Sequence, residues 1–269
     1  MRLAVAATAP FGAAVLERLA AGHDVDLVLT RPDRPRGRGR KVAPPPAKEV
    51  AERLAIPVAQ PEVLDEFPGD ADTVVVVAYG VLIPERLLEE RLWLNVHPSL
   101  LPRWRGAAPV ERALMAGDRE TGVTIHRTTG ELDAGPIAAQ RAFPVGPEDD
   151  AGAVGARAAE LAVDLIDEVL PEPRFRPQPE EGVTYAEKIG PADRELDWSR
   201  PADELVNRVR ALSPHIGARG VVDGRPLIVW RARPAGPGAG LVAGEVELLE
   251  VQPEGRRRMT AAEYLRGRR

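Results

Sequence analysis

The chain has 269 residues, of which 44% are hydrophobic, and a net charge of −5 at neutral pH. This length suits one large domain, or one medium domain and a small one. No apolar run approaches the roughly 18 to 20 residues of a membrane span, and the N-terminus has no signal-peptide layout, so we expect a cytoplasmic protein with no membrane partner. The lack of cysteine excludes disulfides, thiol nucleophiles and thiolate metal sites.

From the N-terminus, short apolar runs alternate with segments of helical spacing. The runs with strand character are residues 3–7, 25–29, 56–58, 73–78, 93–96 and 123–127. The segments with helical spacing are residues 14–19, 47–55, 84–91, 108–116 and 151–170. This alternation predicts an α/β domain with a mostly parallel, Rossmann-like sheet and helices on both faces.

Two segments of the chain are strongly basic. Residues 31–41 hold six cations and one Asp, a net charge of +5, and their prolines and glycines predict a surface loop without regular structure. Residues 256–269 also carry +5, so the rest of the chain sums to −15. Such asymmetry is typical of proteins that bind a polyanion locally. A solvated arginine-rich surface is the alternative, and charge alone favours it.

A proline-rich stretch separates the first domain from a smaller one. Residues 171–181 contain four prolines and little that could be buried, which indicates an extended linker. Beyond it, residues 202–212 have helical spacing, and short strands surround turns such as Asp223-Gly224. The expected divisions of the chain are a first domain over residues 1–170, a linker over residues 171–200 and a small β-rich domain over residues 201–269.

Two polar side chains lie where the strand of residues 93–96 ends. Asn95 and His97 are two positions apart, so strand alternation points both side chains to the same side. They lie at the carboxyl end of their strand, where ligands bind in open parallel sheets. The amide donates without charge, and the imidazole can donate or accept a proton. Asp133, after the last predicted strand, can orient the imidazole or relay a proton. A strand-end cap with a satisfied histidine explains Asn95 and His97 equally well.

The trio suits attack on a carbonyl by a nucleophile that the substrate supplies. The chain has no cysteine, and Ser99 has no obvious paired base. Asn95 and His97 would hold the oxyanion, and Asp133 would help to remove the proton from an attacking amine.

Metal and dinucleotide chemistry are not expected. His97 and Asp133 alone are too sparse for a zinc site, which typically has three protein ligands. The other histidines are scattered along the chain: His23, His126 and His215. A nucleotide-binding Rossmann protein is disfavoured, since no G-x-G-x-x-G follows the first strand.

Longer motifs around the trio resemble the folate-dependent formyltransferases. Residues 95–110 read Asn-Val-His-Pro-Ser-Leu-Leu-Pro-Arg-Trp-Arg-Gly-Ala-Ala-Pro-Val, and residues 132–135 read Leu-Asp-Ala-Gly. The other segments that carry the resemblance are residues 30–41, 75–80, 122–125 and 184–189. The Asn, His and Asp alone do not distinguish members that formylate glycinamide ribonucleotide or sugar amines from those that hydrolyse formyltetrahydrofolate.

The resemblance implies that 10-formyltetrahydrofolate is the formyl donor and that its formyl carbon faces the catalytic residues Asn95, His97 and Asp133. It also implies that the folate lies in a cleft between the segment of residues 75–84 and the turn of residues 99–102. The implied folate-binding residues are Ser99, Leu100, Leu101, Pro102, Tyr79, Gly80, Val81 and Leu82. A cis peptide bond between Leu101 and Pro102 is implied as well.

The basic segment distinguishes among members of the family. In the members of the family that this chain resembles most, the segment of residues 31–41 reaches the acceptor arm of a transfer RNA. The resemblance therefore implies that the formyl group is transferred to the amino group of methionine on initiator tRNA. The implied tRNA-binding residues are Arg31, Arg34, Arg36, Arg38, Arg40 and Lys41. Two alternatives remain: formyl transfer or hydrolysis on a small amine or water, and a non-catalytic RNA-binding relative. We expect a monomer.

The resemblance implies an open, OB-like β-barrel for the C-terminal domain. The stretch between Trp230 and Glu245 is about twenty residues shorter than that pattern, so we expect a truncated barrel. Either strands are missing and sheet edges are exposed, or another element covers the edges.

Overall fold

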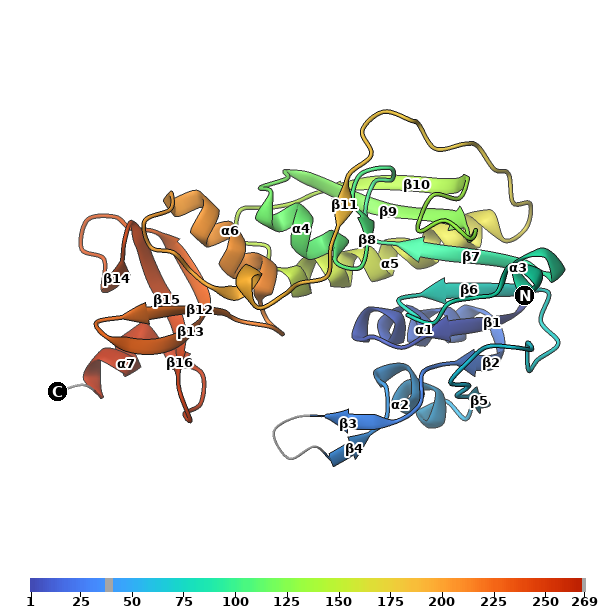
Figure 1. Cartoon of the computed structure of the whole chain (residues 1–269), viewed down its shortest axis with the longest axis horizontal. Coiled ribbons are helices and arrows are strands. Elements are labelled where there is room, and N and C mark those ends of the chain that lie inside the picture. Colours follow the sequence, from blue (N-terminus) through green and yellow to red (C-terminus); the bar gives the residue numbers. More distant parts are fainter. Residues whose placement is uncertain (37–40, 268–269) are drawn as a thin grey trace. The chain divides into compact units, whose positions relative to one another are not determined.

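The structure, a computed structural model, describes residues 1–36 and 41–267 (Figure 1). The chain forms two compact units. The first consists of Met1–Ala107, Gly122–Ala142 and Ala156–Tyr185, and the second of Ala108–Thr121, Phe143–Gly155 and Ala186–Arg269. The second unit therefore includes two short segments from the first two thirds of the sequence.

A seven-stranded sheet forms the centre of the first unit, in the order β10-β9-β7-β6-β1-β2-β5. Its strands are β1 (Arg2–Ala7), β2 (Asp24–Leu29), β5 (Val58–Ala59), β6 (Thr73–Val77), β7 (Leu92–His97), β9 (Glu120–Arg127) and β10 (Ile137–Pro144). β1 pairs in parallel with β2 and β6, β2 with β5, and β6 with β7. β9 runs antiparallel to β7. The predicted α/β domain with a parallel-rich sheet is confirmed.

Helices alternate with these strands, close to their predicted positions. They are α1 (Pro10–Gly22), α2 (Pro46–Arg53), α3 (Glu85–Glu90), α4 (Pro109–Met115) and α5 (Ala151–Val169). Proline stands in the first turn of α1, α2 and α4, where a backbone N–H has no partner within the helix. α1 buries Val15, Leu16 and Leu19, the apolar stripe of its sequence. Among the described residues, no helix combines the length and the apolar character that crossing a bilayer requires.

The strand β10 does not follow from the sequence patterns. It lies at one edge of the sheet, and of its residues only Ile137 is fully buried. Because the rest of the strand is half-buried or exposed, it lacks the alternation of apolar and polar residues that reveals a strand in a sequence.

The basic segment contains regular structure, and the prediction of an irregular loop is wrong for the part that is described. Residues Arg34–Arg36 form β3, which pairs antiparallel with β4 (Lys41–Ala43). These strands make up a two-stranded sheet, in which both strands are edges. Pro35 is compatible with β3 because an edge strand has one side without ladder hydrogen bonds.

The chain after α5 is mostly exposed, as a linker would be, yet up to Tyr185 it belongs to the first unit and its backbone is hydrogen-bonded there. Arg176 and Ile137 exchange backbone hydrogen bonds of 2.7 and 2.9 Å. The N–H of Arg105 donates to the carbonyl oxygen of Thr184 at 2.9 Å. The short elements of this region are β8 (Arg105–Gly106), β11 (Tyr185–Ala186) and η1 (Ala192–Arg194). A polar extended segment can pair in this way because its backbone groups need partners whatever its side chains are.

A curled antiparallel sheet forms the centre of the second unit, in the order β12-β13-β15-β14, with β16 beside β15. Its elements are α6 (Ala202–Leu212), β12 (Ala218–Val222), β13 (Arg225–Pro234), β14 (Leu241–Ala243), β15 (Val246–Pro253), β16 (Met259–Thr260) and α7 (Ala261–Arg266). The register of β13 and β15 shifts between Val229 and Ala232, and such bulges bend a strand. α6 buries Leu205, Val209 and Leu212 in the core of this unit. The predicted small β-rich C-terminal domain is confirmed.

A close backbone approach requires glycine at position 135. A Cβ atom at Gly135 would lie 1.8 Å from the carbonyl oxygen of Arg127. We expect Gly135→Ala to lower the free energy of unfolding by about 1–3 kcal/mol, the usual cost of overpacking, in urea titrations followed by circular dichroism. Gly130→Ala is the control, because no atom lies within 4 Å of a Cβ there. Equal losses in the two variants would contradict the steric explanation.

Candidate active site

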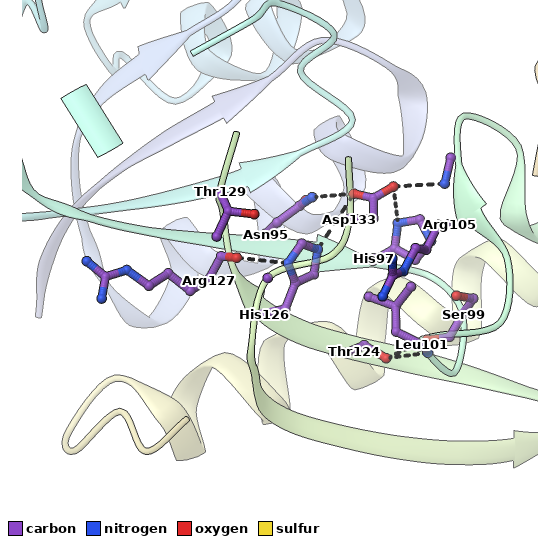
Figure 2. Close-up of polar contacts among 12 residues, drawn as sticks. Asn95, His97, Ser99, Leu101, Arg105, Thr124, His126, Arg127, Thr129 and Asp133 are labelled. Atoms are coloured by element: carbon purple, nitrogen blue, oxygen red, sulfur yellow. Dashed lines mark hydrogen bonds and ion pairs between the residues drawn. The ribbon is translucent and has the colours of Figure 1, made fainter. Parts of the chain in front are cut away.

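The three predicted catalytic side chains meet at the end of β7 (Figure 2). Asn95 and His97 lie on β7, and Asp133 lies in the loop between β9 and β10. Asn95 Nδ2 donates a hydrogen bond of 3.1 Å to Asp133 Oδ1, and His97 Nδ1 lies 3.6 Å from Asp133 Oδ2. His97 and Asp133 are 4% and 9% exposed. The structure therefore brings the predicted trio together in a nearly buried cluster.

The backbone around Asp133 fixes the position of its carboxylate. The φ angle of Asp133 is +47°, in the left-handed region that Asp tolerates better than most residues other than glycine. The N–H of Gly106 donates a hydrogen bond of 2.8 Å to Asp133 Oδ2. Gly106 has a φ of +127°, a conformation that favours glycine. Both ends of this hydrogen bond thus depend on uncommon backbone conformations, which are frequent at functional sites.

The surroundings of Asp133 keep its carboxyl group ionised. Burial by itself raises the pKa of Asp133, since it penalises the charged form. The contacts with His126 and His97, together with the N–H of Gly106, outweigh burial and hold the pKa below its usual value. Asp133 is therefore a carboxylate at neutral pH and can accept a proton.

His97 faces Asp133 through one ring nitrogen. Its Nε2 atom lies 2.8 Å from the carbonyl oxygen of Trp104, and because a carbonyl only accepts, Nε2 carries the proton. Burial lowers the pKa of His97, and the attraction of Asp133 offsets this only in part, so the ring is neutral at neutral pH. Nδ1 of the neutral ring is then an acceptor that points toward Asp133.

A second imidazole reaches the same carboxylate, although His126 lies apart from the trio in the sequence. His126 on β9 pairs in register with Asn95 on β7, and its Nε2 lies 3.6 Å from Asp133 Oδ1. The ring centroids of His126 and His97 are 6.4 Å apart. The sequence contains no direct signal for this contact, because the antiparallel pairing of β9 with β7 has to be known first.

The first group of predicted folate-binding residues forms a tight turn after β7. Ser99 is fully buried, its hydroxyl donates to the carbonyl oxygen of Arg103 at 2.7 Å, and its own carbonyl accepts from the hydroxyl of Thr124 at 2.7 Å. The N–H of Leu101 donates to the same hydroxyl, and the Leu101–Pro102 bond is cis, as the resemblance implied. Leu100 and Pro102 are half-buried. Ser99 and Leu101 thus define the shape of the turn from inside the protein.

The second group follows β6, whose residue Val76 pairs with Asn95. Tyr79 is 2% exposed, and burial raises its pKa to about 12. Gly80 has a φ of +72°, in the left-handed region, while Leu82 is 83% exposed. This segment therefore combines a buried anchor with an apolar side chain on the surface, next to the strand that carries Asn95.

The predicted tRNA-binding residues fall into two places. Arg31 is half-buried, and one nitrogen of its guanidinium lies 3.7 Å from the position of a Cβ at Gly80. Arg34 on β3 and Lys41 on β4 are exposed. The side chain of Arg36, and all of Arg38 and Arg40, lie outside the described residues.

The strands β3 and β4 of the basic segment are called the basic hairpin below. A hydrogen-bonded carboxylate, that of Asp33, lies at its base. Lys48 Nζ lies 2.9 Å from Asp33 Oδ2, and the Gln60 amide donates to both Asp33 Oδ1 and the carbonyl oxygen of Arg31 at 2.8 Å. Hydrogen bonds from Gln60 and Lys48 lower the pKa of Asp33, so it stays ionised. Hydrogen bonds from Lys48 and Gln60 therefore hold the residues just before β3 in place.

Gln178 is a further residue of the site that the sequence patterns do not reveal. Its amide nitrogen donates to the carbonyl oxygens of Asp133 at 2.7 Å and Gly135 at 2.8 Å. Its oxygen accepts from Nη2 of Arg105 at 2.7 Å and from Nε at 3.1 Å. Gln178 thus holds the backbone of the loop that presents Asp133, from a segment that reads as a linker because it is rich in proline.

The arrangement suits proton transfer beside a carbonyl group. It combines a buried, ionised carboxylate and a buried, neutral imidazole with the half-buried amide donor of Asn95. Among the described residues, no group of three or more histidine or acidic side chains could hold a metal ion. The chemistry that these residues can support by themselves is acid–base catalysis and stabilisation of an oxyanion.

Comparisons with known proteins give matches along the whole chain. The family description "Formyl transferase" matches residues 1–170, and "Formyl transferase, C-terminal domain" matches residues 188–269. A methionyl-tRNA formyltransferase of Paracoccus denitrificans is 45% identical, with 99% of this chain and 97% of the relative covered. One of Aromatoleum aromaticum is 43% identical, with 99% and 94% covered. These alignments extend over 291 and 297 residues, so the relatives contain residues that this chain lacks.

Solved structures share the fold at low sequence identity. The sugar 3N-formyl transferase WlaRD, determined with dTDP and 5-N-formyl-THF, has a TM-score of 0.68 at 15% identity and covers 96% of this chain and 99% of its own. HypX from Aquifex aeolicus in complex with tetrahydrofolic acid has a TM-score of 0.63 at 20% identity, with 98% of this chain and 46% of its own covered. At these identities the likeness shows the fold alone.

The hydrogen bonds of Gln178 predict a measurable contribution to stability. We expect Gln178→Ala to lower the free energy of unfolding by about 1–3 kcal/mol, because it leaves the carbonyl oxygens of Asp133 and Gly135 without their donor. Urea titration measures this loss. Glu180→Ala is the control, since this exposed neighbour should change stability by no more than about 0.5 kcal/mol. A Gln178→Ala variant as stable as the control would show that these hydrogen bonds do not hold the loop.

Proposed function

Because the chain belongs to the formyl transferase family, we propose that it transfers a formyl group from 10-formyltetrahydrofolate to the amino group of methionine on initiator methionyl-tRNA, for translation initiation. The observation that carries this proposal is the 45% identity to a methionyl-tRNA formyltransferase over nearly the whole of both chains. The two-domain match to the family supports the same enzyme class, a formyl transferase. The folates in the HypX and WlaRD structures support a folate derivative as the formyl donor.

The proposed reaction begins when the methionine nitrogen attacks the formyl carbon. A bond forms between this nitrogen and the carbon, and the carbonyl electrons move to the oxygen. Asp133, already ionised, accepts the proton that the nitrogen must lose. Asn95 supports the oxyanion, since its amide nitrogen carries two hydrogens and can donate to Asp133 and to the oxyanion at the same time.

Collapse of the tetrahedral intermediate completes the transfer. The carbonyl re-forms, the bond between the formyl carbon and N10 of the folate breaks, and N10 takes up a proton. His97 is suited to carry this proton, because its Nδ1 is an acceptor 3.6 Å from Asp133 and its Nε2–H is engaged by Trp104. Once protonated, Nδ1 can also donate to the oxyanion.

The donor and the acceptor are assigned to separate parts of the first domain. We place the folate against the two segments that flank β7 in the site, with Ser99, Leu100, Leu101, Pro102, Tyr79, Gly80, Val81 and Leu82 as its contacts. We place the tRNA on the basic hairpin, with Arg31, Arg34, Arg36, Arg38, Arg40 and Lys41 as its contacts. The neighbouring positions of Arg31 and Gly80 support this division, because the acceptor amine has to approach the folate.

The remaining parts of the proposal concern the working form of the enzyme. It acts in the cytoplasm as a monomer, without a membrane partner, and residues 1–170 form its catalytic domain, joined by a linker over residues 171–200 to the small domain of residues 201–269. It requires no metal, since proton transfer and hydrogen bonding suffice for the steps above. A formylation assay with the purified protein, 10-formyltetrahydrofolate and methionyl initiator tRNA tests the function. Formylation of small amines without any activity on the tRNA would favour the alternative reading.

Asp133 provides the first mutational test. We expect Asp133→Asn to lower single-turnover formylation by about a hundredfold or more, the usual contribution of a general base, while the affinity for the folate stays close to that of the wild type. Rapid-quench formylation of charged initiator tRNA and a fluorescence titration of folate binding measure the two quantities. Near-normal turnover would remove Asp133 from the mechanism.

The basic hairpin provides the second test. Replacing Arg36, Arg38 and Arg40 together with Ala should raise the KM for tRNA and lower the slope of its salt dependence by about one for each lost phosphate contact. The control removes three exposed arginines elsewhere: Arg53, Arg86 and Arg174. If both triple variants had the same KM and salt slope, the hairpin would not be the tRNA-binding element.

A further inference from the structure

Thr124 on β9 is a fully buried residue to which the mechanism above gives no role. It pairs in register with His97, so it lies beside the point where β7 ends and the turn of residues 99–102 begins. Its hydroxyl donates to the carbonyl oxygen of Ser99 at 2.7 Å and accepts from the N–H of Leu101 at 3.2 Å (Figure 2). One side chain therefore holds two backbone groups of the turn.

Gln140 on β10 reaches the same hydroxyl from the edge strand of the sheet. Its amide nitrogen donates to the carbonyl oxygen of Leu101 at 2.9 Å and to the hydroxyl of Thr124 at 2.8 Å. A carbonyl oxygen can only accept a hydrogen bond, so the amide must face it with its nitrogen. The orientation of the amide thus follows from this contact, and both of its hydrogens are used.

The hydrogen-bonding capacity of the Thr124 hydroxyl is fully used. A hydroxyl has one hydrogen to donate and two lone pairs that accept. The Ser99 carbonyl takes the hydrogen, and the donors of Leu101 and Gln140 take the two lone pairs. The hydroxyl of Ser99 is engaged elsewhere, since it donates to the carbonyl oxygen of Arg103. A side chain with the shape of threonine but no hydroxyl would leave the turn without these contacts.

The backbone of β9 supports the turn as well. A Cβ atom at Gly122 would lie 2.5 Å from Cδ2 of Leu100, so the Leu100 side chain packs directly on the backbone of the strand. Leu101, whose N–H and carbonyl oxygen are both hydrogen-bonded, is 3% exposed, while Leu100 and Pro102 are half-buried. The inner side of the turn is therefore held by β9 and β10, and Leu100 and Pro102 are the residues that a ligand can contact.

We propose that Thr124 and Gln140 are positioning residues that hold the turn of residues 99–102 in the shape that binds the folate. This inference rests on the proposed function, in which the folate lies against that turn. Because the turn follows His97 directly, its position also sets the distance between the formyl carbon and the catalytic residues. Loss of the Thr124 hydroxyl therefore affects the folate and the transfer step, whereas the tRNA, assigned to the basic hairpin, binds as before.

Thr124→Val tests this proposal, because valine has nearly the shape of threonine and lacks the hydroxyl. We expect the Kd for tetrahydrofolate, measured by fluorescence titration, to rise about tenfold, the equivalent of one lost hydrogen bond. We expect kcat for formylation of methionyl initiator tRNA to fall by about tenfold to a hundredfold, since a displacement of about 1 Å can cost that much in rate. The KM for the tRNA should stay at the wild-type value. Thr124→Ser keeps the hydroxyl and should restore most of both losses.

Thr128→Val is the matched control. Thr128 directly follows β9, and its buried hydroxyl has no hydrogen-bond partner among the described residues. This variant should bind tetrahydrofolate and turn over as the wild type does. A purely structural role of Thr124 predicts that Thr124→Val, once circular dichroism shows it to be folded, has the wild-type Kd and kcat, and that outcome would overturn the proposal. An equal rise in the KM values for the folate and the tRNA would also overturn it.

Gln140 provides a second variant in case Thr124→Val does not fold. It is half-buried, and Gln140→Met replaces the amide with an unbranched side chain of similar length that has no donor. We expect the Kd for tetrahydrofolate to rise as in Thr124→Val. The double variant should lose less than the product of the two single losses, because both side chains act on one turn. Wild-type affinity in Gln140→Met, or independent losses in the double variant, would contradict the shared role.

The wild-type protein separates this proposal from the proposed function. A wild type that bound no tetrahydrofolate would overturn the placement of the folate, and the role of Thr124 and Gln140 would fall with it. A wild type that binds tetrahydrofolate and formylates the tRNA, together with variants that match it in both measurements, would overturn the role of Thr124 and Gln140 alone.

Discussion

Burial of the Asp133 carboxylate is the constraint on which the site depends, because an ion taken out of water must recover its lost hydration from neighbouring donors. Those donors come from separate elements, Asn95 from β7 and the N–H of Gly106 from β8, while the ring of His126 on β9 lies 3.6 Å from the carboxylate. No single element supplies enough of them. The carboxylate is therefore stable only when β7 and β9 of the seven-stranded sheet and β8 of a separate two-stranded sheet are assembled around it.

The loop that carries Asp133 needs the same kind of support from outside the sheet. Its left-handed conformation at Asp133 costs free energy, and the contact of Gly135 with Arg127 leaves no space for a side chain. Gln178 offsets part of this cost by binding two carbonyl oxygens of the loop while it also fixes Arg105. A segment that reads as a simple connection therefore helps to hold the loop that carries Asp133, although most of its side chains are exposed.

Sequence patterns predicted the parts of the fold that depend on local periodicity. The buried parallel strands and the amphipathic helices were found close to their positions, and alternation along β7 placed Asn95 and His97 on one side. β10 and the β3–β4 hairpin were missed because edge strands with exposed or charged residues lack an apolar repeat. His126 and Gln178 were missed for another reason. Each contacts a residue that is far away in the sequence. The spacing of residues along the chain predicts neither the antiparallel pairing of β9 with β7 nor the contacts of a linker side chain with a distant backbone.

The regions proposed to bind the folate and the tRNA are connected through Arg31 and Gln60. This connection affects how the formyl donor and the acceptor are brought together. Gln60 holds the carbonyl of Arg31 and the carboxylate of Asp33, and the guanidinium of Arg31 lies beside Gly80. The segment assigned to the folate and the base of the hairpin assigned to the tRNA are therefore connected by a few short contacts. Under the proposed function, these contacts would set the position of a tRNA bound at Arg34 and Lys41 relative to the folate segment. Under the proposed function, the hairpin selects the acceptor and the cluster around Asp133 carries out the transfer, so each part can be altered without rebuilding the other.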